Sequence, residues 1–78
     1  MQPIFTIVEY KQANGAIEWK ITHVDCTPMI DDGVTDEEAV HDWAFEKNCT
    51  EGWVLHNYNF FGSVKDAAAW AKGNGWYN

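Results

Sequence analysis

The fold is decided by residues 4–24, which read IFTIVEYKQANGAIEWKITHV. Asn14 and Gly15 form the pair that a two-residue type I′ turn prefers, because both central residues of this turn need positive φ. A turn at this point pairs the two flanking segments antiparallel and sets Glu9 opposite Lys20. Opposite charges that face each other stabilise paired strands, so the stretch predicts a β-hairpin with one register.

The same register divides the hairpin into two faces. A second pair of opposite charges, Lys11 and Glu18, lies on the face that also carries Phe5, Ile7 and Val24. The apolar end of that face must contact another part of the protein. The opposite face is more continuously apolar, and we expect it to be the core side. It carries Ile4, Thr6, Val8, Tyr10, Ile17, Trp19, Ile21 and His23.

A loop and a first helix are predicted after the hairpin. Residues 26–33 include Pro28 and Gly33 and show no sustained periodicity, which is typical of a loop. Thr35 is the expected N-cap of the helix, with Glu38 three residues later to complete a capping box. The core side of this helix is expected to carry Ala39, Val40, Trp43 and Ala44.

A third strand and a second helix complete the predicted order ββαβα. Residues 53–61 are rich in aromatic and β-branched side chains, as strands are, although Asn57 and Asn59 weaken the second half. Ser63 is the expected N-cap of a short helix that ends at Gly73. The core side of this helix is expected to carry Val64, Ala67, Trp70 and Ala71.

The 78 residues are enough for one domain, 1–78, and too few for two. An antiparallel three-stranded sheet with both short helices on one face is the simplest way to bury these apolar stripes. We therefore predict a small two-layer α+β domain. Large aromatic side chains compensate for so small a core, because they bury the most apolar area. Of the five tryptophans, we assign Trp19, Trp43 and Trp70 to the core.

The net charge of −7 is concentrated in the middle of the chain. Residues 25–51 contain nine of the 12 acidic residues and one lysine, whereas the segments before and after them are nearly neutral. The chain has no arginine, which disfavours direct binding of nucleic acid, because phosphate backbones require clustered cations. A localised acidic field instead favours a basic partner.

Signals for targeting or membrane insertion are missing from the sequence. No apolar run approaches the roughly 20 residues of a membrane span, and the first residues form neither a basic nor a long apolar leader. We therefore expect a cytoplasmic protein without membrane contact, in which Cys26 and Cys49 are reduced.

Residues for catalysis or metal binding form no recognisable motif. Ser63, the only serine, already has a capping role, and no pair of histidines or cysteines has the spacing that holds a zinc ion. We therefore predict a protein that is not an enzyme and has no metal or cofactor. A small thiol enzyme is the least favoured hypothesis. Its nucleophile and base would be Cys26 or Cys49 with His23, His41 or His56.

The acidic segment has a helical arrangement that folding alone does not require. Glu38, Asp42 and Glu46 recur every four residues on one helix face, where like charges are mutually destabilising. Their spacing of roughly 6 Å along the helix is comparable to that of successive phosphates in a nucleic-acid strand. The alternative is a solvated face that keeps an aromatic-rich protein soluble. The predicted partner-binding residues are Asp31, Asp32, Asp36, Glu37, Glu38, Asp42 and Glu46.

Short length, concentrated acidity, absence of arginine and lack of a catalytic motif give the chain a resemblance to a known class of proteins. It resembles the small acidic inhibitors that bacteriophages and mobile elements encode, anti-CRISPR proteins among them. This resemblance implies stoichiometric binding to a basic nucleic-acid channel of a host protein or nucleoprotein complex. The first hypothesis is therefore a non-enzymatic inhibitor that mimics nucleic acid.

The second hypothesis is an assembly or self-association module whose acidic residues only keep it soluble. High salt distinguishes the two hypotheses, because it weakens electrostatic complexes and hardly affects apolar ones. The apolar contact would involve Phe5, Ile7, Val24, Trp53, Trp76 and Tyr77.

The lack of a ligand motif predicts that neither a chelator nor a reductant alters stability. Thermal melts with and without EDTA or dithiothreitol should agree within about 2 °C, less than the shift that about 1 kcal/mol produces in so small a domain. A larger drop with EDTA would reveal a structural metal, and a larger drop with dithiothreitol would reveal a disulfide.

Overall fold

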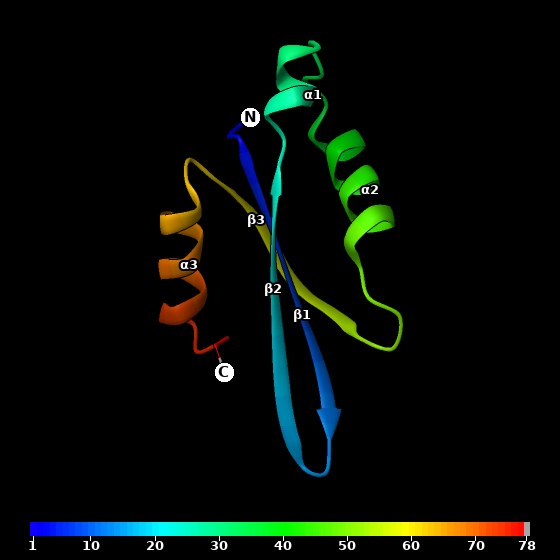
Figure 1. Ribbon diagram of the computed structural model, residues 1–78, viewed down its shortest axis with the longest axis vertical. Helices are drawn as coiled ribbons and strands as arrows, with labels where there is room; N and C mark the ends of the chain where they lie inside the picture. The colour runs from blue at the N-terminus through cyan, green and yellow to red at the C-terminus, as the bar shows by residue number, and fades with distance from the viewer. Residues whose placement is uncertain (78) are drawn as a thin grey trace.

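The computed structural model describes residues 1–77 as a three-stranded antiparallel sheet with α-helices on both of its sides (Figure 1). The elements in chain order are β1 (Ile4–Ala13), β2 (Ala16–Asp25), α1 (Thr27–Asp31), α2 (Glu37–Asn48), β3 (Val54–Phe61) and α3 (Val64–Gly73). The predicted α+β class and antiparallel sheet are confirmed, and one short helix, α1, is added to the predicted order. Within residues 1–77, no helix is long and apolar enough to cross a membrane.

The predicted register of the hairpin is confirmed. β1 and β2 pair antiparallel with Glu9 opposite Lys20. Asn14 and Gly15 have φ values of 55° and 79°, the two positive values that a type I′ turn requires. The turn and the facing charges therefore agree on how the first two strands are aligned.

β1 is the central strand of the sheet, between β2 and β3. Its residues 5–9 are all buried, although successive side chains of a strand point to opposite faces. Both faces are therefore covered, and Figure 1 shows α2 on one side of the strands and α3 on the other. The core on the α2 side consists of Phe5, Ile7, Val24, Cys26, Val40 and Ala44.

The structure corrects the expectation that both helices share one face. The face with Phe5 and Ile7, expected only to need some contact, holds the main apolar cluster beneath α2. The face predicted as the core side contains the buried Thr6 and Val8 and lies against α3, while its outlying Ile17 remains 48% exposed. A central strand with apolar residues on both faces needs a cover on each, so the helices lie on opposite sides.

The starts of α2 and α3 are set by side-chain caps. Ser63 caps α3 as predicted, because its Oγ accepts a hydrogen bond from the amide of Asp66 at 3.2 Å. The N-cap of α2 is Asp36 and not the predicted Thr35, and Asp36 accepts from the amide of Glu38. A carboxylate is at least as good a cap as a hydroxyl, and its charge also suits the positive end of the helix.

Two further local expectations are corrected. Residues 27–31 form a helix where a loop was expected, because proline suits a first helical turn and Asp25 accepts a hydrogen bond from the amide of Thr27 at 2.9 Å. Gly73 is the last residue of α3, and the positive φ that follows the helix, 78°, belongs to Gly75.

The core sides of α2 and α3 are largely as predicted. Ala39 and Val64, both in first turns, are exposed, which corrects the prediction at these two positions. The buried members are Val40, Ala44, Ala67 and Ala71, and the half-buried members are Trp43 and Trp70.

The expected ion pair between Glu9 and Lys20 is replaced by contacts of both residues with Thr50. Glu9 is 1% exposed, and its Oε2 accepts a hydrogen bond from the amide of Thr50 at 2.8 Å. Lys20 donates from Nζ to Oγ1 of Thr50 and lies 5.9 Å from the ring centre of Trp53. Both strands of the hairpin thus hold the connection between α2 and β3.

This anchoring predicts different effects for two substitutions of Glu9. Glu9→Ala removes the acceptor of a partly buried amide and should lower the free energy of unfolding by about 1–3 kcal/mol. Glu9→Gln keeps a carbonyl acceptor for Thr50 and removes a buried charge, so it should cost clearly less. Urea denaturation measures both, and the exposed Glu18→Ala is the control, with an expected change within about 0.5 kcal/mol. Equal losses for the alanine and glutamine variants would contradict the anchoring role.

Candidate functional site

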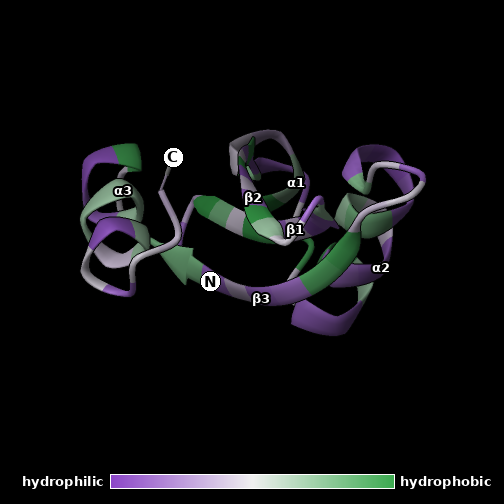
Figure 2. Ribbon diagram, turned by 90° about the horizontal axis from the view of Figure 1, so that it is seen from below, coloured by the Kyte–Doolittle hydropathy of each residue, from purple (hydrophilic) through white to green (hydrophobic). Residues whose placement is uncertain are grey.

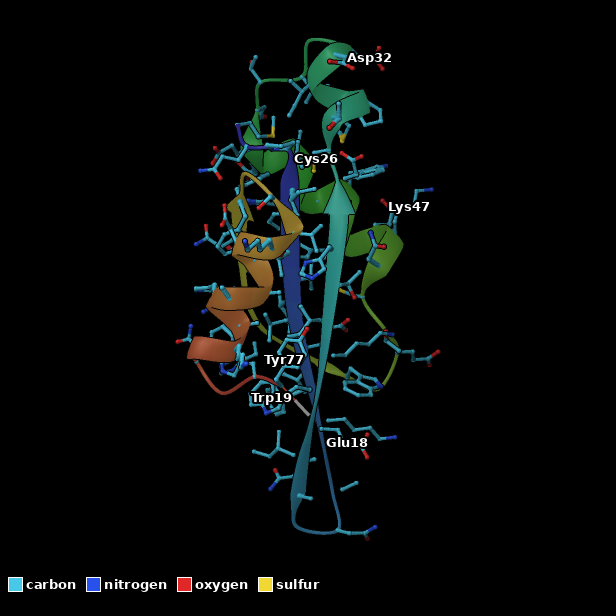
Figure 3. The ribbon with its side chains drawn as sticks, turned by 60° about the vertical axis from the view of Figure 1, so that its left-hand side comes forward. Glu18, Trp19, Cys26, Asp32, Lys47 and Tyr77 are labelled. Carbon is cyan, nitrogen blue, oxygen red and sulfur yellow. The ribbon has the colours of Figure 1, made fainter. Side chains whose placement is uncertain are left out.

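The acidic residues lie at one end and along one side of the molecule. α1 occupies one end of the long axis, where Figure 3 labels Asp32, and α2 runs along the side of the strands (Figures 1 and 3). All seven predicted partner-binding residues are exposed. They are Asp31, Asp32, Asp36, Glu37, Glu38, Asp42 and Glu46.

α2 presents a row of carboxylates to the outside. Each residue of a helix advances by about 100°, so Asp42 lies on the side opposite to the buried Val40 and Ala44. Glu38 and Glu46 lie about one turn before and after it on the same outer side. Figure 2 shows hydrophilic residues along much of this helix. The structure therefore brings the predicted row together, and we call these three carboxylates the acidic row.

Only part of the acidic segment stabilises the fold. Asp36 Oδ1 accepts from the amide of Glu38 at 3.0 Å, and Glu37 and Glu38 lie near the positive end of the helix dipole. The side chains of Asp42 and Glu46, by contrast, make no hydrogen bond or ion pair with another residue among 1–77. Their charges are left to solvent or to a partner.

Most lysines lie away from the acidic row. Lys47 belongs to α2, whereas Lys11 and Lys20 belong to the hairpin, and Lys65 and Lys72 belong to α3. Because α3 lies across the sheet from α2, its lysines are on the opposite side of the molecule (Figure 1). Among residues 1–77, Lys47 is therefore the one lysine on α2 itself, and Lys20 lies near the end of this helix through its contact with Thr50.

The two thiols are held in their protonated form. Cys26 is buried and donates to the carbonyl oxygen of Val24 at 3.7 Å, and burial followed by the charge of Asp25 raises its pKa. Cys49 is an exposed free thiol, and its pKa is raised by desolvation and then by the charge of Glu9. Nucleophilic cysteines need the opposite shift, because the thiolate is the reactive form.

The three histidines considered as bases pack against other side chains. His23 Nδ1 lies 2.9 Å from Oγ1 of Thr6. His41 stacks on the ring of Phe5 with 4.9 Å between ring centres. His56 lies in a separate cluster on the α3 side of the sheet, described next.

An aromatic cluster on the α3 side is the main feature that the sequence did not reveal. The rings of Trp19 and Trp76 each lie 5.0 Å from His56, and Trp70 lies 4.9 Å from Trp76. Local patterns give no signal for it, because its members come from β2, β3, α3 and the segment after α3. A shallow hollow of about 230 Å³ beside the cluster is lined by Trp19, Ile21, Trp76 and Tyr77.

The apolar surface expected for self-association is largely internal. Phe5 and Ile7 are fully buried and Val24 is 7% exposed, all beneath α2. Trp53 and Trp76 are half-buried, and Tyr77 alone of the expected contact residues is exposed. The sequence could not reveal the burial of Phe5, Ile7 and Val24, because α2, the helix that covers them, is distant in the chain.

Comparison with known proteins gives no match: no family model, curated protein sequence or solved structure is significantly similar to this chain.

The environment of His23 predicts a loss of stability at acidic pH. Burial lowers the pKa of His23 below its ordinary value of 6.5, so the folded protein binds this proton less readily than the unfolded chain. The stability that neutral His23 contributes to the folded protein is complete above about pH 6.5 and is lost as the pH falls through the lowered pKa.

Urea denaturation between pH 8 and pH 5 tests this effect. Wild type should lose more stability on acidification than His23→Gln, which has no titrating group at this position. Parallel curves for the two proteins would show that His23 does not contribute.

Proposed function

We propose that this chain is a non-enzymatic acidic interaction protein that binds a basic, nucleic-acid-binding surface of a protein or nucleoprotein complex as a stoichiometric inhibitor. The observation that carries the proposal is the acidic row of Glu38, Asp42 and Glu46, which faces outward from α2. Like charges at this spacing are mutually destabilising on a helix, so a role in binding accounts for them better than a role in folding.

The acidic row is suited to a surface that normally holds phosphates. Its carboxylates recur roughly every 6 Å along the helix axis, comparable to the repeat of phosphates along one strand. The exposed acidic residues of α1 extend the negative field toward the end of the molecule. A field of one sign accelerates the encounter with a basic partner and makes the complex sensitive to salt.

Two other considerations support a binding role. The raised pKa values of both cysteines disfavour the thiolate that a thiol enzyme would use. The resemblance to small acidic phage-encoded inhibitors supports the same class of partner and a site of action in the cytoplasm of a host cell. Self-association through Phe5, Ile7 and Val24 is not carried forward, because these side chains are buried.

The test compares two variants that have the same net charge. Glu38→Gln, Asp42→Asn and Glu46→Gln together neutralise the acidic row with little change in shape. Gln12→Lys, Ala16→Lys and Ala69→Lys together add the same charge at exposed positions on the hairpin and α3. Each protein is immobilised, and proteins captured from a host-cell extract are eluted with a salt gradient or with single-stranded DNA.

The proposal expects wild type and the lysine variant to retain a protein that DNA releases, and the neutralised row to lose it at low salt. Near-UV circular dichroism of the tryptophans first establishes that both variants are folded. Equal weakening in both variants would show that net charge alone matters. The proposal would be contradicted if the variant with the neutralised row still retained this protein, or if DNA did not release the protein from wild type.

A further inference from the structure

The outer edge of β3 is a potential site of strand addition. β3 lies at the edge of the sheet, and within the part of the chain that the structure describes it pairs only with β1. An edge strand exposes unpaired amides and carbonyls that can pair with another chain. Val54, Leu55 and Tyr58 on this strand are 50%, 40% and 41% exposed, so apolar side chains would favour such pairing.

The register shows which groups of β3 point outward. Odd-numbered residues of β1 bond to β2, as the hydrogen bond from the amide of Cys26 to the carbonyl of Pro3 at 2.7 Å shows at the end of the hairpin. In antiparallel sheets a residue that bonds to one neighbour does not bond to the other. Phe60 and Tyr58 lie opposite the odd-numbered residues 5 and 7 of β1. Their amides and carbonyls therefore point away from β1, toward the open edge.

Two asparagine side chains occupy the outward amides. Asn57 Oδ1 accepts a hydrogen bond from the amide of Tyr58, and Asn59 Oδ1 accepts one from the amide of Phe60, both at 2.8 Å. Each asparagine thus satisfies the donor of the residue that follows it. The middle of β3 stands out as hydrophilic between apolar ends in Figure 2.

A bulge protects the rest of the same edge. The register of β3 against β1 shifts between Val8 and Glu9, so His56 is inserted between Leu55 and Asn57. A bulge bends the strand and interrupts the regular row of edge groups that a second strand needs.

We propose that Asn57 and Asn59 close the β3 edge to strand addition and thereby prevent this chain from pairing with a second copy of itself. Two β3 edges could join only if the amides of Tyr58 and Phe60 donated to the other copy, and these amides are already engaged. The proposal also explains why two residues that disfavour strands occur in a strand otherwise rich in apolar and aromatic residues. It does not depend on the acidic row.

The experiment removes the two acceptors. Asn57→Val with Asn59→Val frees both amides and raises the strand propensity of the edge. Sedimentation velocity over a hundredfold range of protein concentration should show wild type as a monomer and the valine variant as a dimer or larger species at high concentration. A wild type that dimerises with the amides of Tyr58 and Phe60 in the interface would overturn the proposal.

Two controls separate the edge from its side chains. Gln12→Val with Thr35→Val adds the same two valines at exposed positions away from β3 and should remain monomeric. Asn57→Asp with Asn59→Asp keeps the acceptors and should also remain monomeric, in high salt as well. A valine variant that is folded and monomeric, or equal association of both valine variants, would refute the proposal.

A measurement on wild type alone covers the case in which the valine variant does not fold. The amides of Ile21 and His23 point outward from the edge of β2, by the same register, and have no acceptor among residues 1–77. Hydrogen exchange, corrected for intrinsic rates, should be about fivefold or more slower at Tyr58 and Phe60, because one hydrogen bond must open first. Equal protection at the two edges would show that Asn57 and Asn59 do not hold the amides of Tyr58 and Phe60, and would refute the proposal.

Discussion

The burial of both faces of β1 is the constraint on which the rest of the structure depends. A strand in the centre of a sheet uses all its backbone groups in pairing, and residues 5–9 also lose contact with water on each side. One helix cannot cover two faces, so α2 and α3 must lie on opposite sides, and the connection between them must cross from one side of the sheet to the other. β3 makes that crossing, and Glu9 and Lys20 hold its approach through Thr50.

Interactions between near neighbours in the chain were predictable from the sequence, and those between distant segments were not. Asn14 and Gly15 with the facing charges define the hairpin register, and Ser63 defines the start of α3, because the groups involved are close in sequence. Neither the position of β3 beside β1 nor the burial of Glu9 has a local signal. Periodicity identifies the apolar face of each helix, but it does not tell which face of the sheet that helix covers.

The same distinction applies to the candidate site. The acidic row was predictable, because exposure on a helix follows from its period and from the buried Val40 and Ala44. The surface predicted for self-association was wrong at Phe5, Ile7 and Val24, which are buried. The sequence does not show that α2 covers these three residues, so they looked exposed. Asparagines in a strand looked like weak strand formers for a similar reason: their use becomes visible only when the strand is known to be an edge.

The central position of β1 also orders events during synthesis of the chain. β1 leaves the ribosome before β2, which joins it almost at once, whereas β3 emerges only after both α1 and α2. The ladder between β1 and β3, with Ile4 opposite Phe61, therefore closes only after β2, α1 and α2 have all emerged. Until then the hairpin has an open edge on its most apolar strand, and a nascent chain that stalls after α2 is a natural substrate for chaperones that bind exposed strands.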